Sequence, residues 1–196
     1  MYSAEKLKGG KVETMTLKKI ENYLESHGWT RKIAGDADFD VALLAVKQMA
    51  EARKGLIVSG EYGVGKSALV AIAARAFGGE VFKVRLAIPD DLDRFTRSWQ
   101  EFHVENPYAQ NAWLDDLGAE NPVSDYGVRL ERAGDFIVTW HELHRPGTRL
   151  VVTTNLTTAE LDARYGGRVL SRLKDLCVPL RLDGGDKRQW TTGGAK

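Results

Sequence analysis

Residues 60–67 read GEYGVGKS and follow directly on the apolar run GLIVS. A short apolar run ended by glycine predicts a buried strand, and the apolar sequence KSALVAIAARAF predicts a buried helix after it. The eight residues fit the pattern G-x-x-x-x-G-K-[ST] in full, in the strand-to-helix context that the pattern requires. We call this segment the glycine loop. It constrains the chain to a fold built on a strand–loop–helix unit.

The glycine loop has the residues needed to hold phosphate groups. Glycines let the backbone approach phosphate oxygens closely, and N–H groups at the start of a helix carry partial positive charge. Lys66 adds a full charge at the outer phosphates, and Ser67 offers a hydroxyl to Mg²⁺. We therefore expect ATP and Mg²⁺ as cofactors. The predicted nucleotide-binding residues are Gly60, Glu61, Tyr62, Gly63, Val64, Gly65, Lys66 and Ser67.

The rest of the chain alternates between strand and helix patterns. Short apolar runs predict strands in EVFKVRL, NAWLDDLG, RLVVTTN and CVPLRL. Helices are predicted at about 17–25, at 39–53, in PDDLDRFTRSWQEF, and in TAELDARYGGRVLSRLKDL with a break at its two glycines. A further helix is marked by Leu130, Ala133, Ile137 and Trp140. This alternation predicts an α/β fold, a parallel sheet of about five strands with helices on both faces.

Length and composition are those of a globular protein with one domain of ordinary size. Of its 196 residues 43% are hydrophobic, enough for a full core. We expect a short helical extension at 1–38, an ATPase domain at 39–189 and a flexible tail at 190–196. About 14 residues follow the last predicted strand, so no C-terminal lid domain is expected.

The same sequence predicts a cytoplasmic protein. No apolar run is long enough to cross a membrane, and the N-terminus lacks the apolar core of a signal peptide. The single cysteine, Cys177, fits a reducing compartment and is interpreted as a small buried hydrophobe.

Two further motifs end predicted strands. In WLDDLG, Asp115 is placed to hold Mg²⁺ and Asp116 to orient or deprotonate an attacking water; the alternative is that the pair caps a loop. In VVTTN, Asn155 is placed to hold that water, unless it only forms a turn. Ligands gather at the carboxyl ends of parallel strands, so these side chains are expected to meet at one edge.

Arginines late in the chain are candidates to contact bound phosphate groups. Arg168 and Arg172 lie four residues apart on one predicted helix face, which suits a phosphate of a neighbouring subunit, although they can also be solvated surface residues. Arg188, in GGDKR, is a candidate to reach the nucleotide of its own subunit. His141 and His144 lie three residues apart, but a zinc site needs further ligands, and the sequence has no paired Cys/His cluster.

Charge is unevenly distributed, although the net charge is only +1. The segment from Asp90 to Asp135 has eleven acidic and four basic residues, and the segment from Arg164 to Lys196 has eight basic and three acidic. Either these are two solvated faces, or a basic edge of one subunit meets an acidic edge of the next in head-to-tail self-association.

The motifs GEYGVGKS, WLDDLG, VVTTN, YGGRVLSRL and GGDKR resemble, in order and spacing, those of DnaC-type bacterial helicase loaders and their relative, the transposition helper IstB. The resemblance covers about residues 39–189. It implies an AAA+ ATPase in which Asp115 and Asp116 are the Walker B pair and Asn155 is sensor 1. It also implies that Arg168 or Arg172 is an arginine finger and Arg188 the sensor 2 candidate.

Four functions remain open from the sequence. The resemblance favours a helicase loader or remodeller in DNA replication, whose partners are single-stranded DNA and a DnaB-type replicative hexameric helicase. An IstB-like helper presenting DNA to a transposase is the second hypothesis. A small nucleotide kinase is the third, although such kinases usually begin with the glycine loop, which here starts at residue 60. The fourth is an ATP-binding assembly protein with negligible turnover.

Overall fold

The computed structural model describes residues 17–26, 30, 32, 36–70, 81–88, 90–97, 111–125, 128–143 and 148–185. Its helices are α1 (Leu17–Ser26), α3 (Asp36–Ala52), α6 (Arg132–Leu143) and α7 (Thr158–Leu176), with shorter helical segments at 66–70 and 91–97. Its strands are β1 (Gly55–Ser59), β2 (Val81–Arg85), β3 (Asn111–Leu117), β4 (Val123–Asp125), β5 (Val128–Leu130), β6 (Leu150–Thr154) and β7 (Cys177–Arg181). The predicted alternation of strands and helices is confirmed over these residues.

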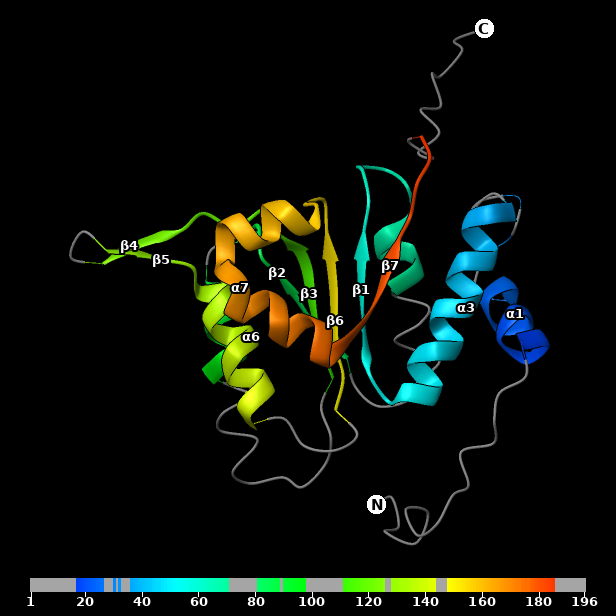
Figure 1. Ribbon diagram of the computed structural model, residues 1–196, viewed down its shortest axis with the longest axis horizontal. Coiled ribbons are helices and arrows are strands. Elements are labelled where there is room, and N and C mark those ends of the chain that lie inside the picture. The colour runs from blue at the N-terminus through cyan, green and yellow to red at the C-terminus, as the bar shows by residue number, and fades with distance from the viewer. Residues whose placement is uncertain are drawn as a thin grey trace, which may run out of the picture.

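Five of the strands form one sheet in the order β2-β3-β6-β1-β7, and all neighbouring pairs are parallel (Figure 1). β1 lies in the interior of the sheet, with Leu56 opposite Val151 of β6 on one side and Val178 of β7 on the other. β3 is the other neighbour of β6. The chain segments that leave β1, β3 and β6 therefore emerge side by side at the carboxyl edge of the sheet.

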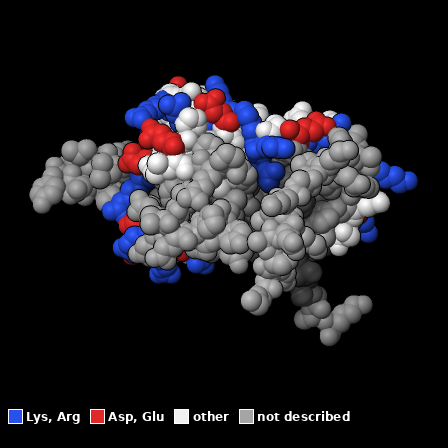
Figure 2. All heavy atoms as spheres, turned by 90° about the horizontal axis from the view of Figure 1, so that it is seen from below, with Lys and Arg blue, Asp and Glu red and all other residues white. Residues whose placement is uncertain are grey.

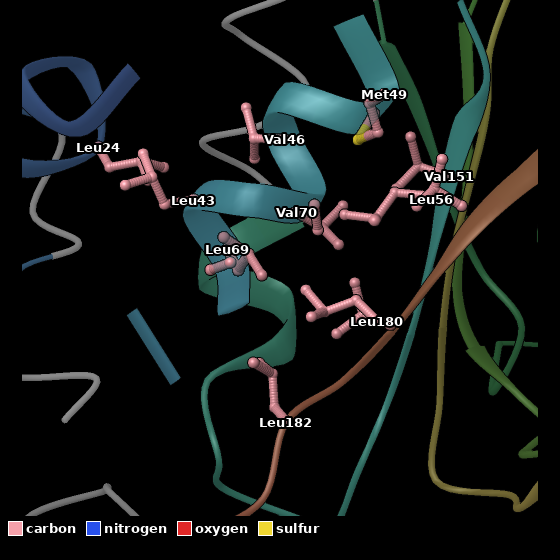
Figure 3. Close-up of a cluster of buried hydrophobic side chains, with 14 of the residues drawn as sticks. Leu24, Leu43, Val46, Met49, Leu56, Leu69, Val70, Val151, Leu180 and Leu182 are labelled. Carbon is pink, nitrogen blue, oxygen red and sulfur yellow. The ribbon is translucent and has the colours of Figure 1, made fainter. Parts of the chain in front are cut away.

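Helices cover both faces of this sheet, as predicted (Figure 1). Successive strand residues point to opposite faces. Trp113 of β3 thus belongs to the buried cluster beneath α3, whereas Ala112 and Leu114 belong to the cluster beneath α6 and α7. Figure 3 shows the first cluster, which is formed by α1, α3, the 66–70 segment, the strands β1, β6 and β7, and the residue after β7. Its labelled members are Leu24, Leu43, Val46, Met49, Leu56, Leu69, Val70, Val151, Leu180 and Leu182.

The N-terminal helix α1 packs on α3 (Figure 1). Its Leu24 is fully buried and is part of the same cluster as Met49 and Leu56 (Figure 3). Burying a leucine side chain contributes about 2 kcal/mol, so apolar packing holds α1 on α3. Among the described residues, none of the helices combines the length and apolar character needed to cross a membrane.

The antiparallel pair β4–β5 was not predicted from the sequence, and it projects from the side of the molecule (Figure 1). Leu130 was assigned to the following helix, and this is wrong, because Leu130 is the last residue of β5 and α6 begins at Arg132. The error has a simple cause. Leu130 and Ala133 have helical spacing, whereas strands of three residues are too short to show an alternating pattern.

Helix α7 contains the predicted break. A capping box of Thr157 and Glu160 begins the helix, and Gly166 interrupts it with a φ of 81° and a ψ of 162°. Glycine adopts this left-handed backbone without the cost that a Cβ brings. The first half of α7 therefore lies across the carboxyl edge of the sheet, and the second half runs back over the sheet to β7 (Figure 1).

Cys177, at the start of β7, is buried in the core, as predicted. Burial raises the pKa of its thiol to about 12, and the Sγ donates to the carbonyl of Leu150 at 3.2 Å. The cysteine is therefore a packing residue with little thiolate character.

Candidate functional site

The glycine loop connects β1 to the 66–70 helical segment at the carboxyl edge of the sheet. Gly60, Gly63 and Gly65 have φ values of 149°, 79° and 99°, which residues with a Cβ rarely adopt. A Cβ on Gly60 would also lie 2.2 Å from the carbonyl oxygen of Leu182. The glycines of the pattern are thus needed for the shape of the loop itself.

Lys66 is only 6% exposed, and its ammonium donates three hydrogen bonds to oxygen atoms. The acceptors are the carbonyls of Gly60 at 2.9 Å and Glu61 at 2.7 Å, and the side-chain Oδ1 of Asn155 at 2.6 Å. Since a lysine ammonium has three donors, the buried charge is well solvated by the protein. The structure therefore brings Asn155, the residue after β6, to the lysine of the glycine loop.

The two aspartates lie at an irregularity in β3. The register between β3 and β6 shifts between Leu114 and Leu117, and Asp116 has a φ of 61°. Such a bulge re-aims side chains next to functional sites, and a non-glycine residue in this conformation stores about 1 kcal/mol of strain. The alternation of side chains between the two faces of the sheet is therefore interrupted where the two aspartates lie.

Hydroxyl groups fix the first of these carboxylates. The Oδ1 of Asp115 accepts hydrogen bonds from Thr153 Oγ1 at 2.9 Å and from Ser67 Oγ at 3.3 Å. Thr153 Oγ1 in turn accepts from the backbone N–H of Asp116 at 2.9 Å. Thr153, which was not identified from the sequence, therefore orients both aspartates.

Asp116 is half-buried, and its pKa is raised above the ordinary value. Burial is the largest cause, and the negative charge of Asp115 is the second, while the charges of Lys66 and Lys83 partly offset both. A carboxylate whose pKa is raised is a stronger base, as general-base catalysis at neutral pH requires.

Lys83, on β2, is a residue of this cluster that the sequence analysis missed. Its Nζ lies 2.7 Å from Asp115 Oδ2 and 4.2 Å from the centre of the Trp113 ring. β2 pairs with β3 so that Lys83 lies opposite Trp113. The sequence did contain a signal for Lys83, because a lysine between two apolar residues of a predicted strand needs a partner for its charge.

The residues around Asp115 fit a magnesium ion in part. Magnesium is usually held by one or two carboxylates with substrate phosphates and water, and Asp115 and Ser67 supply a carboxylate and a hydroxyl 3.3 Å apart. In the described ranges, this site included, no group of three or more His, Cys, Asp or Glu residues lies together as metal ligands. His141 instead lies 3.5 Å from Asp175, and His144 lies outside the described residues.

Arg164 is a third residue, after Thr153 and Lys83, that was not identified from the sequence. Its guanidinium, on the first half of α7, donates to the carbonyls of Gly118 and Glu120 after β3, the latter at 2.5 Å. It also donates to the carboxylate of Glu131 at 3.2 Å. The neighbouring Tyr165 hydroxyl donates to Glu120. These contacts hold the first half of α7 against residues 118–120, which follow the two aspartates.

The predicted finger arginines lie beyond the kink in α7. Arg168 pairs with Glu142 of α6 at 3.0 Å, and Arg172 is 3.8 Å from Asp175. None of these recorded contacts is with the glycine loop of the same chain. Arg188 lies outside the described residues. The face seen in Figure 2 shows the described acidic and basic side chains interleaved rather than separated into two areas.

Comparison with known proteins assigns the chain to no family. A scan against protein-family models finds no match to the chain, and a search of curated proteins finds no significant match. The evidence on function is therefore the cluster around the glycine loop and the motifs of the sequence.

Proposed function

We propose that the chain is a P-loop ATPase of the AAA+ type, similar to DnaC and IstB proteins, which binds ATP with Mg²⁺ and hydrolyses it. The observation that carries the proposal is the hydrogen-bonded cluster in which Lys66 meets Asn155 and Ser67 meets Asp115. These four residues come from three segments far apart in the sequence. Their convergence on a glycine-rich loop is what nucleotide hydrolysis requires.

Each side chain has a role in this proposal. Lys66 and the loop N–H groups hold the phosphate oxygens, and Ser67 and Asp115 hold Mg²⁺, which neutralises phosphate charge. Asp116 accepts a proton from the attacking water, whose oxygen forms a bond to the γ-phosphorus as the bond to ADP breaks. Asn155 exchanges its contact with Lys66 for one with that water.

The biological role follows from the resemblance of the motifs. We place the chain in the cytoplasm as a helicase loader or remodeller that binds single-stranded DNA and a DnaB-type hexameric helicase, and that associates head to tail with its own copies. An IstB-like helper of a transposase is the alternative. YGGRVLSRL supports both, because its Arg168 lies on an exposed part of α7.

Hydrolysis is tested by measuring phosphate release from ATP, with and without Mg²⁺ and single-stranded DNA. Asp116→Asn keeps the shape of the site and removes the base, so it should bind ATP while hydrolysing it about 10²-fold more slowly. Normal turnover in this variant would mean that Asp116 is structural. Transfer of phosphate to a nucleoside monophosphate would replace the proposal with a kinase.

The partner is tested by pull-down with a DnaB-type helicase or a transposase, with and without ATP. ATP-dependent retention of the helicase supports the loader, and retention of the transposase alone supports the IstB-like helper. Binding of single-stranded DNA should weaken steeply as salt increases, because contacts to phosphate release counterions. DNA binding that does not change with salt would contradict this part of the proposal.

A further inference from the structure

Lys83 lies outside every motif that points to ATP hydrolysis, yet its ammonium contacts the proposed metal-binding carboxylate. Asp115 uses its Oδ1 for the hydroxyls of Thr153 and Ser67, and its Oδ2 for Lys83 at 2.7 Å. Both oxygens of Asp115 are therefore engaged within the chain.

Lys83 compensates for a costly arrangement of charge. Asp115 and Asp116 are adjacent carboxylates, of which Asp115 is buried and Asp116 is half-buried. Two neighbouring negative charges repel each other, and the repulsion grows when the charges are partly withdrawn from water. An ammonium at hydrogen-bond distance from Asp115 offsets this repulsion.

A divalent cation on Asp115 would meet the ammonium of Lys83. Two positive charges on the same carboxylate repel each other, so metal and ammonium compete for it. Lys83 is able to leave, because its side chain is 39% exposed and has four rotatable carbons. Its departure also removes the cation from the face of the Trp113 ring.

We propose that Lys83 is a tethered cation that competes with Mg²⁺ for Asp115, so that it sets the magnesium affinity of the site and swings away when the metal binds. The inference rests on the proposed function for the identity of the metal. It makes Lys83 a positioning residue, since it acts on the metal site through Asp115.

Lys83→Met tests the competition, because methionine keeps most of the apolar stem over Trp113 and removes the charge. Lys47→Met is the matched control. Lys47 is exposed to a similar extent, 36%, and pairs with Glu51 on α3, away from the aspartates. The wild type and both variants are titrated with Mg²⁺ in a calorimeter, with and without a non-hydrolysable ATP analogue, while tryptophan fluorescence is recorded.

Lys83→Met should bind Mg²⁺ about tenfold more tightly than the wild type, which corresponds to about 1.4 kcal/mol. Lys47→Met should behave as the wild type. Magnesium should change the tryptophan fluorescence of the wild type, and this change should be much smaller in Lys83→Met. Unchanged or weaker magnesium binding by Lys83→Met overturns the inference, and weaker binding of the analogue would assign Lys83 to the phosphates instead.

The two proposals fail in different ways. If the analogue does not bind to the wild type, the proposed ATPase function is wrong, while a magnesium affinity that depends on Lys83 still supports the competition. If the analogue binds and Lys83→Met leaves magnesium affinity unchanged, the competition is wrong and the ATPase proposal stands. If neither analogue nor Mg²⁺ binds, both are wrong.

Discussion

Arg164 and Arg168 lie four residues apart in α7, on either side of the kink at Gly166. The Arg164 side chain is 17% exposed and contacts Glu131 and the segment after β3. The Arg168 side chain is 68% exposed, and its recorded partner is Glu142 at the surface. One arginine is thus committed to its own chain, whereas the other has a solvated ion pair that a different partner can replace.

The comparison bears on how the proposed ATP site is completed. Phosphoryl transfer is commonly accelerated by an arginine from a neighbouring subunit. Arg164 is held by contacts within its own chain. If an arginine from a neighbour completes the proposed site, the more exposed Arg168 is a stronger candidate than Arg172.

The largest expected effect is that Arg168→Ala lowers the rate of ATP hydrolysis. If Arg168 completes a neighbour's site, the variant should bind ATP normally and hydrolyse it about 10³-fold more slowly. Mixing it with Asp116→Asn should restore activity, because each variant supplies what the other lacks, and wild-type activity should rise faster than linearly with protein concentration. Mixed assemblies without any gain would show that each site is completed within one chain.

Arg164→Ala should instead act on stability. It removes the guanidinium that pairs with Glu131 and Glu120 and that donates to two carbonyls, so the free energy of unfolding should fall by about 2–4 kcal/mol. Urea denaturation measures the change. Arg164→Lys, the matched variant, keeps the charge but loses the planar fork, and it should recover only part of the loss. A loss below about 0.5 kcal/mol for the alanine variant would mean that the fork is incidental.

The contrast between these arginines shows what the sequence could and could not supply. Apolar periodicity predicted the sheet and the helices, and the pair of glycines predicted the break at Gly166, because these signals are local. Lys83, Thr153 and Arg164 were missed, since their roles depend on strand register and on contacts between segments about 30 to 50 residues apart. The bulge that gives Asp116 its positive φ likewise has no signature in the sequence.

Asp116→Asn should raise stability slightly. The folded state raises the pKa of this carboxyl, so it binds more protons than the unfolded chain, and the stability of the wild type falls as the pH rises through the raised pKa. The variant should therefore gain about 0.5 kcal/mol at neutral pH, because Asp116 is only half-buried. The gain should vanish near pH 4, close to the ordinary pKa of aspartate. A gain that is equal at both pH values would exclude this electrostatic origin.

The smallest expected effect is on the stability of Arg168→Ala. Its surface pair with Glu142 should contribute less than about 0.5 kcal/mol to the free energy of unfolding. Urea denaturation of this variant beside Arg164→Ala completes the comparison. If both variants lost the same free energy of unfolding, Arg164 and Arg168 would not differ in how firmly their own chain holds them.

ATP binding by Lys66→Ala is the decisive measurement for the glycine loop as a nucleotide site. Lys54→Ala is the control, because Lys54 precedes β1 and donates to the carbonyl of Lys174, away from the glycine loop. With Mg²⁺ present, calorimetry should show ATP binding by the wild type and by Lys54→Ala, and binding at least tenfold weaker, without hydrolysis, by Lys66→Ala. Wild-type binding and turnover by Lys66→Ala would contradict the assignment of the glycine loop as the nucleotide site.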